Sequence, residues 1–199
     1  MIAIITGDIV NSREGNVEEW INLLKTTLNQ YGGEPKHWEI YRGDSFQMAT
    51  DPEQALLAAI HTKATIKQLK QLDVRMAIGI GEISYRPAKI TESNGTAFIR
   101  SGACFESLKK QTLAVQTGEE NLDLSLNIML SLSLLIADHW SPTVASVIKM
   151  TLENPKLNQM EVAHLLDKSQ SSVSEALKRG GFEEIMALNK YYKMKIATL

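Results

Sequence analysis

A run of short polar side chains between Ser169 and Arg179 carries the clearest chemistry in the sequence. Hydroxyl and amide groups on short side chains reach base edges and phosphates when the first turn of a helix enters the major groove of DNA. We therefore predict double-stranded DNA as a partner. The residues expected to contact it are Ser169, Gln170, Ser171, Ser172, Ser174, Lys178 and Arg179.

The elements that would position these side chains form a helix-turn-helix. Ser169 is a suitable N-cap for a helix that begins near Gln170, and Asp167 lies in the turn before it. Ser141 followed by Pro142 predicts the start of a supporting helix upstream. The alternative is a three-helix bundle that contacts only another protein. Apolar residues at helical spacing are expected to form the buried inner faces of these three helices. They are Val144, Val147, Ile148, Val162, Ala163, Leu165, Leu166, Val173, Ala176 and Leu177.

Two aspartates form a second candidate site. Asp8 ends a buried apolar strand that begins at Ile2, and Asp44 lies at the tip of a hairpin between strands 38–41 and 45–49. Oxygen ligands suit Mg²⁺, and nucleotide phosphates would complete its shell, so Asp8, Asp44 and the carbonyl of Ile9 are candidate metal ligands. The alternative is structural, with Asp8 capping the following loop and Asp44 shaping the turn.

The order of elements predicts an α+β fold. Strand 2–6, helix 17–31, the hairpin, a helix from Asp51 to about residue 71 and strand 74–80 give βαββαβ, a ferredoxin-like order. A helix over 96–110 and a strand over 113–116 complete a helix layer on a largely antiparallel sheet. We predict an α+β domain over 1–118, a connecting helix over 119–140 and an all-α helix-turn-helix domain over 141–199.

The connecting helix is apolar on nearly all sides. Asp123 and several serines interrupt it, and no apolar run reaches the ~18–20 residues of a membrane span, so we predict no membrane partner. Such a helix has to pack on more than one side. We expect it to be buried, either between the two domains or against a second subunit.

Charge and cysteine content narrow the class of protein. Residues 1–140 hold 13 Lys and Arg against 17 Asp and Glu, whereas residues 141–199 hold 8 against 6. Because non-specific affinity for DNA grows with the number of phosphates neutralised, so small a surplus of positive charge favours a homodimer.

The lone Cys104 and an N-terminus without a basic leader predict a cytoplasmic protein. The four histidines show no metal-ligand spacing.

Three motifs resemble the catalytic domain of class III nucleotide cyclases and GGDEF proteins over roughly residues 2–108. They are Thr6-Gly-Asp-Ile-Val10, Arg42-Gly-Asp-Ser-Phe46 and Arg75-Met-Ala-Ile-Gly-Ile-Gly-Glu82. The resemblance implies Mg²⁺ and a nucleotide at Asp8, Ile9 and Asp44. This chain departs from the pattern at Ser45, where the GGDEF motif is acidic. The Asn and Arg that act on the transferring phosphate correspond to Ile99 and Ala103, or in a shifted register to Arg100 and Cys104, which argues against catalysis.

The whole chain resembles the SatD family of bacterial proteins. The same motifs carry this resemblance, together with Glu92-Ser-Asn-Gly-Thr-Ala-Phe98, Ser101-Gly-Ala-Cys-Phe105 and the carboxy-terminal segment. The resemblance implies a bacterial cytoplasmic protein with a link to stress response.

These observations predict a DNA-binding transcriptional regulator whose cyclase-like domain senses a nucleotide or dimerises. An enzyme is the second hypothesis: a magnesium-dependent nucleotidyl cyclase or phosphotransferase that uses Asp8 and Asp44. A third makes both domains protein-interaction modules.

Overall fold

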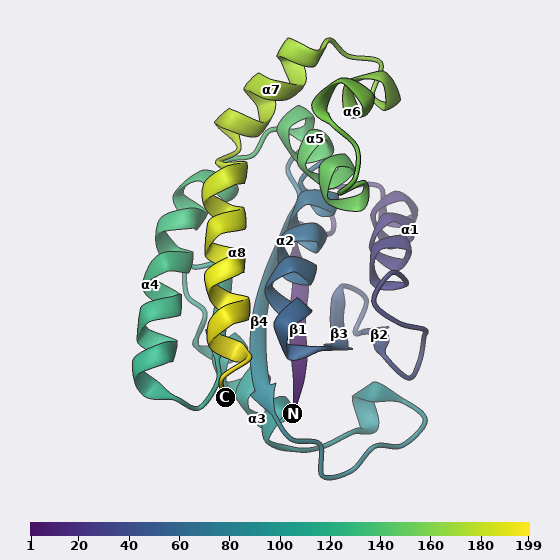
Figure 1. The fold of residues 1–199 in the computed structure, drawn as a ribbon. Helices are drawn as coiled ribbons and strands as arrows, with labels where there is room; N and C mark the ends of the chain where they lie inside the picture. The colour runs from purple at the N-terminus through teal and green to yellow at the C-terminus, as the bar shows by residue number, and fades with distance from the viewer.

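A five-stranded sheet forms the centre of the computed structural model, which describes all 199 residues (Figure 1). The strand order is β2-β3-β1-β4-β5. The central strand β1 is antiparallel to both of its neighbours, and only the β4–β5 pair is parallel, which agrees with the predicted largely antiparallel sheet. The strands are β1 (Ile2–Val10), β2 (Trp38–Tyr41), β3 (Ser45–Thr50), β4 (Asp73–Gly81) and β5 (Leu113–Gln116).

Strand β1 is buried on both faces, as its continuous apolar run predicts. Ala3 and Ile5 face the large core, whereas Ile4 packs in a smaller cluster with Ala97 on the other side. Successive side chains of a strand point to opposite faces, so Asp8 lies on the same face as Ile4.

Helices cover both faces of the sheet, rather than forming the single layer expected from the sequence. Helices α1 (Val17–Leu28) and α2 (Ala55–Ile66) lie on one face, and α3 (Thr96–Ser107) packs on β4 and β1 from the other. The close approach of α3 depends on Gly79, where an added Cβ would overlap the backbone of Ala97 and Ser101. Two short 3₁₀ turns, η1 (Pro52–Gln54) and η2 (Ile90–Glu92), complete this part of the chain.

Helix α2 is the most deeply buried helix, with 11 of its 12 residues buried. It lies between the sheet and the carboxy-terminal helices. The Lys63 ammonium is buried with them and donates to Asp73 at 2.8 Å and Thr112 at 3.1 Å, and it pairs with Asp138 at 2.7 Å. The helix ends at Ile66, earlier than expected, and the chain then forms turns, with a positive φ at Gln71, before β4 begins.

The carboxy-terminal helices continue the same core. One cluster of 41 buried residues runs from the sheet through α2 to the end of the chain. The Trp140 indole donates to the Gly180 carbonyl at 2.9 Å, and the Tyr192 hydroxyl donates to the Pro52 carbonyl at 2.9 Å. These helices are α4 (Glu120–Ala137), α5 (Pro142–Glu153), α6 (Gln159–Leu165), α7 (Gln170–Arg179) and α8 (Phe182–Ile196).

Within the chain the connecting helix α4 is packed on one side only, whereas burial on more than one side was expected. The alternative expectation, burial against a second subunit, stays a prediction. Leu126, Leu130 and Leu134 face β5 and α8, but the opposite side of the helix is exposed. By length and hydropathy alone, α4 is the one helix that could cross a membrane, and a single helix of this kind is weak support for a membrane span.

Candidate functional site

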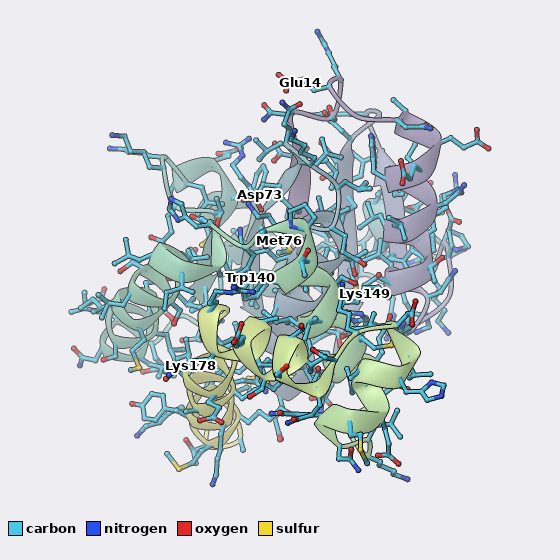
Figure 2. The ribbon with its side chains drawn as sticks, turned by 90° about the horizontal axis from the view of Figure 1, so that it is seen from above. Glu14, Asp73, Met76, Trp140, Lys149 and Lys178 are labelled. Carbon is cyan, nitrogen blue, oxygen red and sulfur yellow. The ribbon has the colours of Figure 1, made fainter.

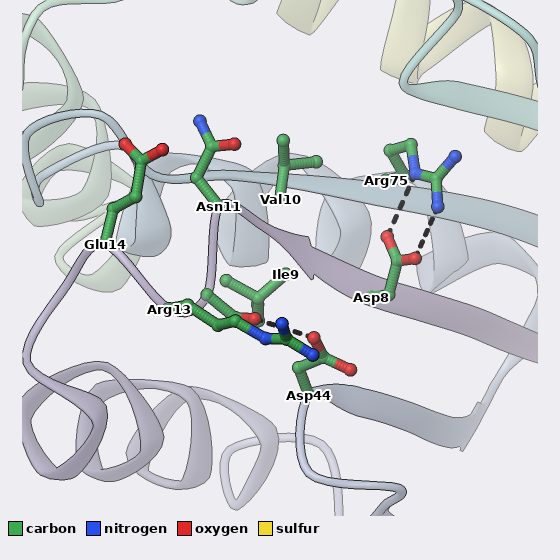
Figure 3. Close-up of a pocket in the computed structure, with 9 residues that line it drawn as sticks. Asp8, Ile9, Val10, Asn11, Arg13, Glu14, Asp44 and Arg75 are labelled. Carbon is green, nitrogen blue, oxygen red and sulfur yellow. Dashed lines mark hydrogen bonds and ion pairs between the residues drawn. The ribbon is translucent and has the colours of Figure 1, made fainter.

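The two predicted aspartates line the same pocket, which has a volume of about 520 Å³ (Figure 3). The end of β1 and its following loop form one wall, the β2–β3 turn contributes Asp44, and β4 contributes Arg75. Ile9 also lines this pocket, although its side chain is part of the core. The structure therefore brings Asp8, Ile9 and Asp44 together.

Asp8 is held by an ion pair that the sequence did not reveal. Arg75 lies directly opposite Asp8 in the β1–β4 ladder, and its guanidinium forms two hydrogen bonds with the carboxylate, one of them 3.0 Å long. The hydrogen bond to Asp8 is the main reason that the pKa of Arg75 is raised. The guanidinium also lies 5.5 Å from the centre of the Phe105 ring, a favourable cation–π distance.

Asp44 is tied to the loop that follows β1. The Ser12 hydroxyl donates to Asp44 Oδ2 at 2.7 Å, and the Ile9 amide donates to the Asp44 carbonyl at 3.1 Å. The Trp20 indole in turn donates to the Ser12 carbonyl at 3.2 Å. The Asp44 carboxylate accepts one side-chain hydrogen bond and forms no ion pair within 4 Å, so part of its acceptor capacity is free.

This donor set fits Mg²⁺ only in part. No group of three or more His, Cys, Asp or Glu side chains is arranged to hold a metal ion. Two carboxylates and one carbonyl would need phosphate oxygens to complete the six oxygen ligands that Mg²⁺ prefers. Asp8 would enter such a shell in competition with Arg75, which already bonds both of its carboxylate oxygens.

The positions that the cyclase resemblance assigns to phosphate contacts lie elsewhere. The Arg100 guanidinium donates to the carbonyls of Ile80 and Thr117, the latter at 2.7 Å. Cys104 is a buried residue of α3, and Ile99 of the same helix is exposed. None of these residues lines the pocket beside Asp8, so the pocket holds no substitute from α3 for the missing pair.

The second predicted site is in the pair formed by α6 and α7. Asn158 and Glu161 form a capping box at the start of α6. Asp167 has a φ of 51°, which turns the chain toward α7, and the Ser169 hydroxyl accepts from the Ser172 amide as the predicted N-cap. The predicted inner residues Val162, Ala163, Val173, Ala176 and Leu177 are buried, whereas Leu165 is exposed because α6 ends there.

The first turn of α7 presents polar groups to solvent. Ser169, Gln170, Ser171 and Ser172 are exposed, as are Lys178 and Arg179, whereas Ser174 is half-buried. The Ser169 hydroxyl is within 2.8 Å of the Ser172 hydroxyl and 3.0 Å of the Ser171 hydroxyl. The Gln170 amide donates to the Gln159 side chain at 3.2 Å, which links the two helices at the surface.

The chemistry of α7 changes along its length. A hollow of about 470 Å³ beside its second half is lined by Ser174 and Lys178 and also by Glu183 and Glu184 of α8. The negative charges of these carboxylates offset the positive charge of Lys178. The first turn of α7 is therefore better suited to bind a polyanion than its second half is. Figure 2 shows Lys178 and Glu14, which lines the Asp8 pocket, on opposite sides of the molecule.

Comparison with known proteins places the chain in a family. Residues 1–195 match the SatD family, so the chain belongs to it. A search of curated proteins found no match.

Proposed function

We propose that this SatD-family chain is a DNA-binding transcriptional regulator that acts as a homodimer and reads double-stranded DNA with α7. In this proposal α5, α6 and α7 form a helix-turn-helix, and the preceding part is a degenerate cyclase-like domain that senses a nucleotide or dimerises. The proposal places the protein in the cytoplasm.

The observation that carries the proposal is the division of α7 into two faces. Val173, Ala176 and Leu177 are buried against neighbouring helices, so α7 is held in one orientation. The exposed amide and hydroxyls of its first turn are then presented as a rigid group. Rigid presentation of such groups at a helix N-terminus is what major-groove reading requires.

The strand order supports a ferredoxin-like arrangement for the first part of the chain. Four strands in the order β2-β3-β1-β4, with α1 and α2 on one face, are what a βαββαβ unit gives when its second and third strands form a hairpin. The fifth strand β5, which joins parallel to β4 through α3, extends this unit.

The first test is selection of binding sites from random double-stranded DNA, followed by anisotropy titrations with the selected sequence. We expect Gln170→Ala or Ser171→Ala to weaken specific binding by about 1–3 kcal/mol if either side chain reads a base. Lys178→Ala should weaken all sequences similarly and reduce the salt dependence. Thr26→Ala, which removes an exposed hydroxyl from α1, is the matched control. Absence of any DNA binding at moderate salt would exclude this function.

An enzyme is the second candidate because Asp8 and Asp44 share one pocket. Bound Mg²⁺ would supply charge neutralisation for a transferring phosphoryl group. Asp8, Asp44 and the Ile9 carbonyl would hold the ion and orient the nucleotide. This candidate predicts turnover of a nucleoside triphosphate that is lost in Asp8→Asn and in Asp44→Asn. Binding of the nucleotide without product would instead favour a sensor.

A further inference from the structure

Helix α4 carries an apolar face that the chain leaves largely uncovered. Five large side chains on it are between 41 and 70% exposed, whereas every other helix has at most two such residues. Their positions fall within about 120° of the helix circumference, given 3.6 residues per turn. The face is formed by Leu124, Ile128, Leu132, Leu135 and Ile136.

The size of this face is that of an interaction site. Its side chains expose on the order of 500 Å² of apolar surface, at the upper end of what monomers usually show. Two such faces together would bury about 1,000 Å², the lower limit for a specific protein interface. Ile128, Leu132 and Leu135 follow the 4-3 spacing that keeps one stripe facing a partner helix.

The charges of α4 favour a protein partner over a lipid surface. The helix contains no Lys, Arg or His, and its charged residues, Glu120 and Asp123, are both in the first turn. Helices that lie on membranes generally carry Lys or Arg on their polar face. An uncharged apolar stripe is instead typical of the core of a homodimer interface.

The direction of α4 relates this face to α7. The carboxy-terminal end of α4 adjoins the corner between α7 and α8, where Ile136 lies against Gly181 and Trp140 bonds to Gly180. In Figure 1, α4 forms one outer edge of the molecule and α7 lies beyond its carboxy-terminal end. Parallel pairing of two α4 helices would therefore place both α7 helices at the same end of a dimer. Antiparallel pairing would place them at opposite ends.

We propose that the exposed face of α4 binds the same face of a second copy of this chain, in parallel, about a twofold axis that runs along the helices. The choice of parallel pairing rests on the proposed function, because two α7 helices can enter successive turns of one DNA face only from the same end. Each residue of the face then meets its own counterpart. The two Glu120 side chains also share one end, so salt should tighten the dimer.

Analytical ultracentrifugation of the full chain without DNA tests the face. We expect a dimer whose dissociation constant rises on the order of 100-fold in Ile128→Glu and in Leu132→Glu, because two carboxylates would be buried opposite each other. Ile99→Glu, at an exposed apolar residue of α3, should leave the dimer intact. A monomeric wild type, including one that binds lipid vesicles through α4, would overturn the proposal.

Disulfide trapping tests the direction. In a parallel dimer, Leu124→Cys and Leu135→Cys each form a disulfide with their own counterpart. In an antiparallel dimer neither does so, and only a mixture of the two variants cross-links. Burial raises the pKa of the native Cys104 thiol to about 11, so it contributes little background. Cross-linking in the antiparallel pattern would overturn the parallel arrangement.

DNA binding by the same variants separates the two proposals. A parallel dimer that binds no DNA keeps this inference and removes the proposed function. A monomer that binds selected DNA removes this inference and the proposed homodimer, but keeps the reading of DNA by α7.

Discussion

The Arg75 guanidinium occupies both oxygens of the Asp8 carboxylate. Its two hydrogen bonds to Asp8 satisfy acceptors that a metal ion would need, and its positive charge disfavours a second cation. Mg²⁺ alone should therefore bind weakly, and binding should be stronger when nucleotide phosphates draw the guanidinium away from Asp8.

Replacing Arg75 by glutamine should tighten the binding of Mg²⁺ alone about tenfold, which is ~1.4 kcal/mol. We expect no more than this, because the Arg75 side chain is 37% exposed and water screens its charge. Calorimetric titration with Mg²⁺ measures the effect. Arg13→Gln removes the same charge from the same pocket without freeing a carboxylate, so its effect should be smaller. Equal effects from the two variants would show that Arg75 does not block Asp8.

The sequence predicted that Asp8 and Asp44 line one pocket, but it did not predict the ion pair that Asp8 forms there. Asp8 and Asp44 could be placed together because a buried strand and a hairpin tip both end in a carboxylate. The partner Arg75 was missed, since it reads as one of the outward residues in an alternating strand. Only the register of β1 against β4, which places Arg75 opposite Asp8, identifies the ion pair.

At the scale of elements, two glycines near α3 have opposite structural roles. Gly79 lies in β4 where α3 crosses it, and a Cβ there would overlap backbone atoms that cannot turn aside. Gly102 lies within α3, and an added Cβ would meet nothing within 4 Å. The same substitution should therefore destabilise one position and stabilise the other.

Gly79→Ala should lower the free energy of unfolding by about 3 kcal/mol, the upper part of the range for overpacking. Gly102→Ala should raise it by about 0.5–1 kcal/mol, because alanine favours the helical backbone over glycine. Urea denaturation followed by circular dichroism measures both changes. A neutral Gly79→Ala would mean that α3 does not approach β4 as closely as the structure shows.

Elements with their own boundary signals were predicted well. Caps at Ser141 and Ser169 mark helix starts in the sequence, and α7 begins at the expected residue. The packing of α4 was not predictable, because its hydropathy is similar on both sides. The side of α4 that becomes buried depends on where β5 and α8 pack. The local sequence of α4 does not contain this information.

At the scale of the whole molecule, a polar network joins the two parts of the chain. His61 of α2 accepts at Nδ1 from the Tyr31 hydroxyl, 3.0 Å away, and donates from Nε2 to Glu153 of α5 at 3.1 Å. Gln30 and Lys149 donate to the same carboxylate. Burial lowers the pKa of His61 more strongly than Glu153 raises it, so the ring is neutral in this arrangement.

A neutral buried histidine makes the stability of the molecule sensitive to acid. The unfolded chain takes up a proton near pH 6.5, but the folded chain resists it down to the lowered pKa of His61. Within that window the unfolded state binds more protons, so this contribution to stability is full above about pH 6.5 and is lost as the pH falls. One group contributes a slope of at most about 1.4 kcal/mol per pH unit.

We therefore expect the free energy of unfolding to fall between pH 7 and pH 5.5, with a smaller slope in His61→Phe than in the wild type. Phenylalanine cannot titrate, and although it forfeits two hydrogen bonds and lowers stability at every pH, the slope remains the readout. His164→Phe, at an exposed histidine of α6, should keep the wild-type slope.

Because one core cluster extends from the sheet to α8, circular dichroism and tryptophan fluorescence should report a single unfolding transition at each pH. Two separate transitions would show instead that residues 1–118 and 141–199 unfold independently, and the acid sensitivity would then belong to their contact rather than to the whole fold.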